Sequence, residues 1–379
     1  MRVLLFTGKG GVGKTTLAAA TAAALASRGS KTLVVSTDPA HSLGDAFGGP
    51  LTGEPAEVDP GLHAAQIDSR SLVDGAWQTL RAQLRSALVT GAGLDSLDAE
   101  ELTVVPGVDE LLALGEVRRL AETGPWEVVV VDCGPTAETL RLLSLPEAVS
   151  GYLTRMYGWK TKLSGVARSV DKLASQLESL RALLTDPVTT SVRLVLTPER
   201  VVVAETRRTL TSLALRGVRV DGLIVNRLMP APGMWRGSAA TWLRTRRAQQ
   251  EEVLAELSRS ALGEGMLSSV EHRAAEPVGL PALREIAREL YGDATPLAGA
   301  GDDPAPLLTM SEVDGGYELR VALPLTRDSV VDLARIDDDL AITVDGFRRL
   351  VALPETLRTC RIADAESDSR GLLVHLERT

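Results

Sequence analysis

The sequence is poor in cysteine and has no long apolar run. Its only cysteines, Cys133 and Cys360, are too few for a disulfide framework or a four-cysteine zinc site, which favours a reducing compartment. No stretch reaches about eighteen consecutive apolar residues, so no integral membrane segment is predicted. The formal net charge of −9 argues against a protein that coats nucleic acid or anionic lipid by bulk electrostatics.

The sequence also does not predict a secretory leader. The first apolar run, residues 3–6, is too short for a signal-peptide core and continues directly into a glycine-rich loop. We therefore expect a cytoplasmic protein. Its 379 residues are enough for two or three domains with ordinary hydrophobic cores.

The glycine-rich loop is the most informative segment that is present. It follows the pattern G-x-x-x-x-G-K-[ST] between a predicted strand and an alanine-rich helix, a context that identifies a phosphate-binding loop whose backbone N–H groups face phosphate oxygens. Lys14 is expected to neutralise the β- and γ-phosphates, and Thr15 to ligate Mg²⁺. The predicted nucleotide-binding residues of the loop are Gly8, Lys9, Gly10, Gly11, Val12, Gly13, Lys14, Thr15 and Thr16.

Lysine is scarce, which makes the two lysines of this loop conspicuous. The chain has six lysines, and the other basic residues among its 41 are arginines. Lys9 and Lys14 both lie inside the loop, although the chain otherwise prefers arginine. A compact point charge is therefore expected to be required at each of these positions.

Five short apolar runs outline the fold class. They lie at 3–6, 31–36, 127–132, 192–197 and 220–226, with helical patterns between them. Continuous apolar strands separated by helices predict a mostly parallel α/β sheet covered on both faces.

Helical insertions are predicted at about 66–120 and 151–190. Within them, residues 163–184 carry leucine and valine at alternating spacings of three and four, and residues 72–88 form a second candidate helix. Such a stripe packs either in the core or against an apolar client.

The composition changes near the carboxyl end. Residues 292–306 are rich in Gly, Ala, Asp and Pro and are predicted to be a linker between an ATPase-type domain, 1–291, and a second domain, 307–379. Beyond the linker the period becomes two, which predicts a small antiparallel β-sandwich. Its expected strands lie at 317–324, 340–345, 347–354 and 371–377.

Two further strings follow predicted strands. Ser36-Thr37-Asp38-Pro39-Ala40-His41-Ser42 ends the second run, and Asp132-Cys133-Gly134-Pro135-Thr136-Ala137-Glu138-Thr139 ends the third. Loops at the carboxyl ends of parallel strands converge on one ligand site.

Together with the two-lysine loop, these strings resemble the ArsA family of ATPases, which includes the guided-entry targeting factors for tail-anchored proteins. The resemblance covers about residues 1–290, including 105–110, and implies a P-loop NTPase fold with a deviant Walker A loop. The terminal region resembles an α-crystallin-type domain. The resemblance implies an ATP-hydrolysing homodimer that uses ATP and Mg²⁺.

The same resemblance assigns roles to individual residues. Lys9 would reach the partner subunit's phosphates, and Asp38 would orient or deprotonate the attacking water. Asp132 would lie near Mg²⁺, through water, and Asn226 would read the adenine. The catalytic set is therefore Asp38, Lys14 and Lys9.

The sequence departs from the family pattern at several positions, and these departures limit which family properties the resemblance implies for this chain. Well-known members read Asp-Thr-Ala-Pro-Thr-Gly-His-Thr in the third loop, so Cys133, Gly134, Ala137 and Glu138 put its coupling to partners in question. The zinc-binding Cys-x-x-Cys is absent from 134–359. The proline expected near the adenine is missing from 270–276.

Three functions remain open from the sequence. The first is an ATP-gated chaperone or targeting factor for hydrophobic polypeptides, with no nucleic-acid partner and with transient membrane association left open. The second is an arsenite or metalloid efflux ATPase subunit, although As(III) favours three thiolates and the chain offers two. The third is a ParA/MinD-like positioning ATPase, which would need a basic patch or tail.

Overall fold

The computed structural model describes most of the chain. The described residues are 1–38, 42–68, 108–134, 175, 178–231, 233–234, 236–258, 266–297, 308–323, 325, 329–368 and 371–378. They form two compact units, one of residues 1–10, 14–190 and 277–288 and the other of residues 11–13, 191–276 and 289–379. The candidate helix 72–88 lies outside the described residues, as does most of 163–184.

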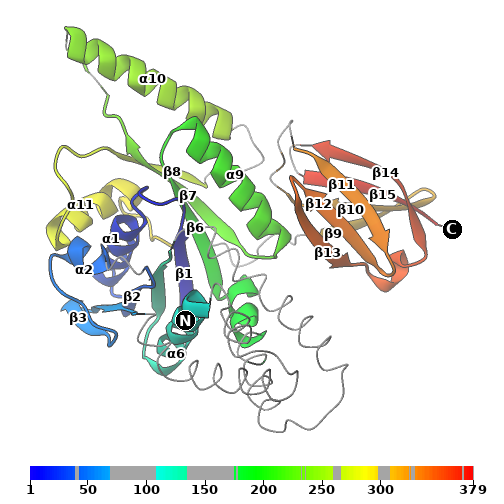
Figure 1. Cartoon of the computed structure of the whole chain (residues 1–379), viewed down its shortest axis with the longest axis horizontal. Coiled ribbons are helices and arrows are strands. Elements are labelled where there is room, and N and C mark those ends of the chain that lie inside the picture. The colour runs from blue at the N-terminus through cyan, green and yellow to red at the C-terminus, as the bar shows by residue number, and fades with distance from the viewer. Residues whose placement is uncertain are drawn as a thin grey trace, which may run out of the picture. The chain divides into compact units, whose positions relative to one another are not determined.

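The first unit is a mostly parallel sheet with helices (Figure 1). Its strands run in the order β3-β4-β2-β5-β1, and only the β3–β4 pair is antiparallel. The elements are β1 (Arg2–Thr7), α1 (Lys14–Ser27), β2 (Thr32–Ser36), α2 (Ser42–Phe47), β3 (Ala56–Asp59), β4 (Leu62–Gln66), α6 (Val108–Thr123) and β5 (Val128–Asp132).

The second unit begins with three neighbouring parallel strands in the order β6-β7-β8. Its elements are β6 (Thr190–Leu196), α9 (Arg200–Leu215), β7 (Val220–Leu228), α10 (Ser238–Ser258) and β8 (Leu267–Glu271). Helix α11 (Leu280–Tyr291) starts in the first unit and ends in the second. All five apolar runs of the sequence are strands, so the predicted mostly parallel α/β fold is confirmed.

Burial follows the apolar pattern of each element. Strands β2 and β5 are buried at every position, as expected for parallel strands covered on both faces. Helix α1 is buried from Leu17 to Ala26, and its many alanines allow close approach to the sheet. Leu180 and Leu184, the last two positions of the predicted 163–184 stripe, are also buried.

The carboxyl-terminal region is an antiparallel β-sandwich, as predicted. One sheet has the order β14-β15-β10-β9 and the other β11-β12-β13, and leucines and valines from both sheets share one core. The elements are β9 (Leu308–Val313), β10 (Gly316–Val321), β11 (Val331–Ile336), β12 (Asp339–Val344), β13 (Phe347–Ala352), the 3₁₀ helix η2 (Glu355–Leu357), β14 (Cys360–Asp368) and β15 (Gly371–Arg378). Strands β9, β11 and β14 were not predicted from the sequence.

The sandwich packs on the end of α9. Leu215, the last residue of α9, is 2% exposed and belongs to the sandwich core. The Arg349 guanidinium on β13 donates to the carbonyl oxygens of Ala214 and Leu215. It thereby provides a partner for the Leu215 carbonyl at the end of the helix, and its positive charge complements the helix dipole.

A buried ion pair lies in the second unit. Arg193 on β6 contacts Asp221 on β7 at 3.1 Å (Nε to Oδ1), with side-chain exposures of 6% and 0%. The same guanidinium donates to the Tyr291 hydroxyl at 2.9 Å and to the carbonyl oxygen of Pro296. This cluster fixes the segment that follows α11 to strands β6 and β7.

Replacing Arg193 by methionine is expected to destabilise the protein by about 3–5 kcal/mol, because Asp221 would remain buried without a counter-charge. Urea unfolding followed by tryptophan fluorescence measures the loss. Tyr291→Phe, which removes one hydrogen bond, should cost only about 1 kcal/mol. An Arg193→Met protein as stable as Tyr291→Phe would contradict this account of the pair.

Candidate nucleotide site

The predicted phosphate loop joins β1 to α1. Gly11 and Gly13 have φ angles of 78° and 95°, values in the left-handed region that glycine adopts without strain. A side chain at Gly13 would also collide with the Asn226 amide nitrogen. The glycine pattern read from the sequence therefore meets a backbone requirement at both positions.

The two loop lysines differ in their environment. Lys14, the first residue of α1, is 5% exposed, and its ammonium nitrogen lies 3.4 Å from the carbonyl oxygen of Lys9. Lys9 has an exposed side chain. Lys14 is thus held within its own loop, whereas the side chain of Lys9 is at the surface.

Asp132 ends β5 and is fully buried. It pairs in register with Phe6 on β1 and with Ser36 on β2, so three carboxyl ends of parallel strands meet there. The Ser36 hydroxyl donates to Oδ2 of Asp132 at 2.9 Å. The other carboxylate oxygen, Oδ1, is buried and has no hydrogen-bond partner among the described residues.

Burial raises the pKa of Asp132 to about 6. Desolvation is the largest cause, since the side chain is fully buried. Hydrogen bonds from the Thr15 and Ser36 hydroxyls and the charge of Lys14 oppose this rise, while the Asp38 carboxylate adds to it. A cation beside Asp132 would oppose this rise and favour its ionised form.

Asp38 follows β2 by two positions, and its backbone is held on both sides. Its N–H donates to the Ser36 hydroxyl at 3.2 Å, and its carbonyl oxygen accepts from Nε2 of Gln66 at 3.0 Å. Strand β4 lies beside β2, with Gln66 in register with Ser36. The main chain that carries Asp38 is therefore anchored, although the side chain is only half-buried.

The oxygen groups near the loop fit a magnesium ion. The hydroxyls of Thr15 and Ser42 lie 2.9 Å apart, and Asp132 contributes an unpartnered buried oxygen in the same unit. Hydroxyl, carboxylate and phosphate oxygens are the hard ligands that Mg²⁺ prefers. When bound, Mg²⁺ would supply positive charge to the phosphates, and Thr15 and Asp132 would hold it.

Asn226 lies two residues before the end of β7. Its Nδ2 donates to the carbonyl oxygen of Val12 at 2.8 Å, and its Oδ1 accepts the N–H of Arg227 at 2.9 Å. The side chain therefore ties β7 to the phosphate loop. Its adenine-reading role stays a prediction.

Sequence reasoning missed the roles of three residues here. Ser36 and Ser42 stood inside a quoted string without a function, and Gln66 was not singled out. The hydroxyls flank Asp38 in sequence, which was an available signal, whereas Gln66 reaches Asp38 only through the pairing of β2 with β4. Residues 39–41, 105–107 and 135–141, which include Ala137 and Glu138, lie outside the described residues.

Comparison with known proteins identifies the family. Residues 1–292 match the family of anion-transporting ATPases named ArsA, and residues 314–376 match the HSP20-like domain found in ArsA. The chain belongs to the ArsA family. The protein is therefore an ATPase with an HSP20-like carboxyl-terminal domain, and a nucleotide is its substrate.

Individual relatives extend over most of the chain. Protein Rv2184c of Mycobacterium tuberculosis is 39% identical over 96% of this chain and 93% of its own length. A putative arsenical pump-driving ATPase of Chlorobaculum tepidum is 33% identical with the same coverage. ATPase GET3C of Arabidopsis thaliana is 32% identical over 74% of this chain and 80% of its own length.

The pH dependence of stability tests the environment of Asp132. Its folded pKa of about 6 exceeds the ordinary 3.8, so its contribution to stability is fully present below pH ~4 and is lost as the pH rises to about 6. Asp132→Asn is expected to stabilise the nucleotide-free ArsA-family protein at pH 7.5 by up to about 3 kcal/mol. Urea unfolding at pH 5 and pH 7.5 measures this difference.

The same substitution should lower ATPase activity, because it removes the negative charge that would hold Mg²⁺ beside Thr15. Glu122→Gln on α6 removes an exposed carboxylate and serves as the control, with no expected change in either measurement. An Asp132→Asn protein that is less stable than the parent at pH 7.5 would contradict the assigned burial cost.

Proposed function

We propose that this ArsA-family ATPase is a homodimer in which closure around MgATP controls the binding of hydrophobic, membrane-protein-like polypeptides, in a chaperone or targeting role. The observation that carries the proposal is the exposure of Lys9 next to the buried Lys14. A loop that keeps one lysine for its own nucleotide can present the other to the nucleotide of a second subunit. A cation supplied in trans is worth about 10³–10⁵ in phosphoryl-transfer rate.

Roles for the site residues follow from their places. Lys14 and the loop glycines hold the phosphates, Thr15 and Asp132 hold Mg²⁺, and Asp38 orients the attacking water. The backbone of Asp38 is fixed by Ser36 and Gln66, which allows its half-buried side chain to be aimed at the nucleotide. Asn226 reads the base.

Mixing two inactive variants tests whether Lys9 acts in trans. A dimer of one Lys9→Ala and one Asp38→Asn subunit contains one complete site if Lys9 serves its partner, and none if it serves its own subunit. Random exchange of a symmetric dimer then restores about a quarter of the parental ATPase rate. Lys31→Ala, which removes another exposed lysine, should hydrolyse ATP normally; a mixture as inactive as its components would overturn the role in trans.

Two observations favour a polypeptide client. The HSP20-like domain is an antiparallel sandwich packed on α9, and relatives of the chain include proteins named ATPase GET3 and GET3C. A client helix of about 20 apolar residues provides the test. Asp38→Asn with MgATP should bind a fluorescent peptide of this kind at least about tenfold more tightly than with ADP, and a peptide with two central lysines should not bind. Equal binding in both nucleotide states would remove the client role.

The arsenite alternative has support from the name of the Chlorobaculum relative. Against it, Cys133 and Cys360 are 2% and 3% exposed, and burial raises the pKa of the Cys133 thiol. Among the described residues, no group of three His, Cys, Asp or Glu side chains could hold a metal. Arsenite should therefore leave the ATPase rate unchanged, and stimulation by arsenite would reverse the preference between the two functions.

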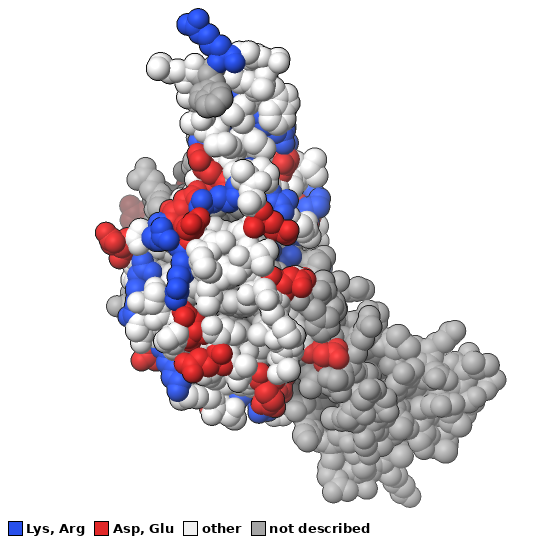
Figure 2. Space-filling model, turned by 90° about the vertical axis from the view of Figure 1, so that its left-hand side faces the viewer, with Lys and Arg blue, Asp and Glu red and all other residues white. Residues whose placement is uncertain are grey.

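The positioning alternative needs a basic surface. On the face shown in Figure 2, Lys and Arg side chains of the described residues are interspersed with Asp and Glu. Basic and acidic side chains of the described residues also form ion pairs, such as Arg247 with Glu251 at 2.7 Å. This arrangement gives no support to a positioning function. Among the described residues, no helix has both the length and the apolar character needed to cross a bilayer.

A further inference from the structure

A pocket in the first unit lies beside the segment that carries Asp38 but is lined by other residues. Its volume is about 550 Å³, within the range of small-molecule sites. The lining residues come from α2, the loop that follows it and the end of β4: Gly44, Asp45, Gly48, Gly49, Pro50, Leu51 and Gln66.

The wall of the pocket is held by backbone hydrogen bonds. The Gly49 N–H donates to the carbonyl oxygen of Gly44 at 3.0 Å, and the Gly48 N–H donates to that of Asp45 at 3.1 Å. A Cβ at Gly44 would lie 2.9 Å from the Gly49 carbonyl oxygen. The tight turn after α2 therefore depends on glycine, and it leaves an open, preformed space.

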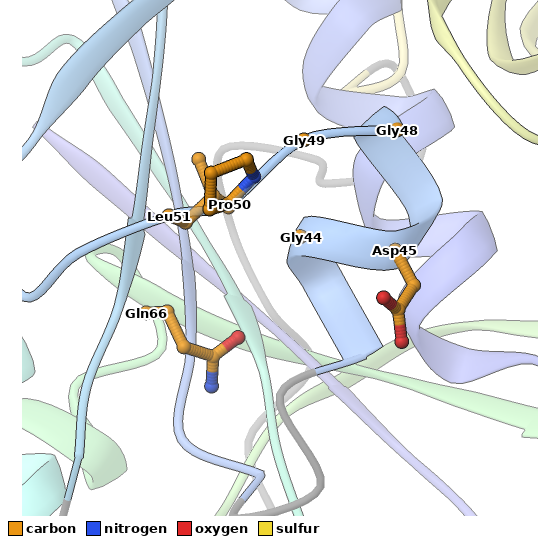
Figure 3. A pocket seen from close by; sticks show the side chains of 7 residues that line it. All are labelled: Gly44, Asp45, Gly48, Gly49, Pro50, Leu51 and Gln66. Carbon is orange, nitrogen blue, oxygen red and sulfur yellow. The ribbon is translucent and has the colours of Figure 1, made fainter.

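Gln66 presents an unsatisfied acceptor to this space. The side chain is 4% exposed, its nitrogen donates to the Asp38 carbonyl oxygen, and its Oε1 has no hydrogen-bond partner among the described residues. The orientation of the amide is fixed, because the Asp38 carbonyl only accepts hydrogen bonds and so requires the nitrogen. In Figure 3 the amide oxygen is turned toward α2, on the side of Gly44 and Asp45.

The lining residues define the chemistry of a ligand. Buried acceptors normally accept a hydrogen bond, and a buried acceptor without a partner has a free-energy cost. A ligand that donates an N–H or O–H to Oε1 of Gln66 would remove this cost. Asp45 adds an exposed carboxylate with no ion-pair partner among the described residues. None of the described residues that line the pocket is basic, which disfavours phosphates, and Pro50 with Leu51 offers apolar contact.

We propose that this pocket is a second binding site, separate from the nucleotide site, for an organic cation with N–H donors, such as a guanidinium group on an apolar body. The guanidinium donates to Oε1 of Gln66 and pairs with Asp45. Because the same Gln66 amide holds the backbone of Asp38, occupancy of the pocket also stiffens the segment that carries the proposed catalytic carboxylate.

Isothermal titration without nucleotide tests binding, so the result does not depend on the proposed client or dimer function. The probe is N-benzoyl-L-arginine amide, and its neutral counterpart is N-benzoyl-L-citrulline amide, which has the same shape without the charge. The arginine compound is expected to bind the parent protein about tenfold more tightly than the citrulline compound. A blocked Gly-Arg-Gly peptide shows whether the natural ligand is an arginine side chain of a polypeptide or a small molecule. If the peptide binds more tightly than the benzoyl-arginine compound, the ligand is an arginine side chain; if it binds more weakly, the ligand is a small molecule.

Two variants locate the site. Asp45→Asn, on an exposed position, and Gln66→Met should each weaken binding of the arginine compound about tenfold. Glu122→Gln, which removes an exposed carboxylate from α6, should bind it as the parent does. Asp45→Asn keeps the test valid if Gln66→Met fails to fold.

Failure of the proposal is defined by the same measurements. It is overturned if the parent shows no saturable binding of the arginine compound at concentrations up to about 10 mM. It is equally overturned if Asp45→Asn binds with parental affinity. Failure of either kind leaves the ATPase assignment untouched, because the titration contains no nucleotide.

Discussion

Lys14→Ala should abolish tight MgATP binding and, with it, ATP hydrolysis. The Lys14 side chain is 5% exposed at the start of α1, and its ammonium nitrogen lies against the Lys9 carbonyl, so its positive charge is held inside the loop. Loss of charge-assisted hydrogen bonds to phosphate should weaken binding at least about 100-fold. Fluorescent ATP titration measures this directly.

A second readout separates lost binding from misfolding in Lys14→Ala. The charge of Lys14 lowers the pKa of Asp132, so its removal should shift the pH dependence of urea unfolding to higher pH while the protein remains folded. Lys31→Ala removes an exposed lysine and should change neither property. Parental ATP affinity in Lys14→Ala would contradict the phosphate-loop assignment.

Asp38→Asn should retain MgATP binding and lose turnover by about 10²–10⁴-fold, the usual contribution of general acid–base catalysis. Asparagine keeps the shape of the side chain, and the backbone contacts to Ser36 and Gln66 do not involve the carboxylate. Single-turnover phosphate release measures the chemical step, and ATP titration measures binding.

A matched substitution defines what the Asp38 result means. Asp45→Asn makes the same chemical change on α2, at an exposed residue outside the proposed catalytic set, and should turn over ATP at the parental rate. Normal turnover in Asp38→Asn would remove Asp38 from the mechanism. A loss of ATP binding in Asp38→Asn would instead assign it to the phosphate site.

The degree to which the fold could be predicted differs between its parts. The five apolar runs were recognised because parallel strands buried on both faces need continuous apolar sequence. Strands β3 and β4 were missed, since β3 has four residues of which none is buried and β4 contains His63 and Gln66. In the sandwich, β14 is mostly exposed and polar, so no apolar alternation marked it.

The candidate site was predictable where its signal is local. The φ angles of Gly11 and Gly13 agree with the glycine pattern, and Asp132 ends β5 as expected. The sequence did not indicate that one oxygen of Asp132 would be buried without a partner among the described residues. That property depends on which strands flank β5.

By itself, the sequence determined the phosphate loop, the parallel order of apolar strands and helices, and the change of period at the second domain. Each of these depends on neighbouring residues, whose spacing sets backbone conformation and the buried face. Only the tertiary structure decided that Gln66 would hold Asp38, that Arg193 would pair with Asp221, and that Leu215 would enter the sandwich core. Such contacts join residues far apart in the chain, and they follow from strand order and from the need to satisfy polar groups once they are buried.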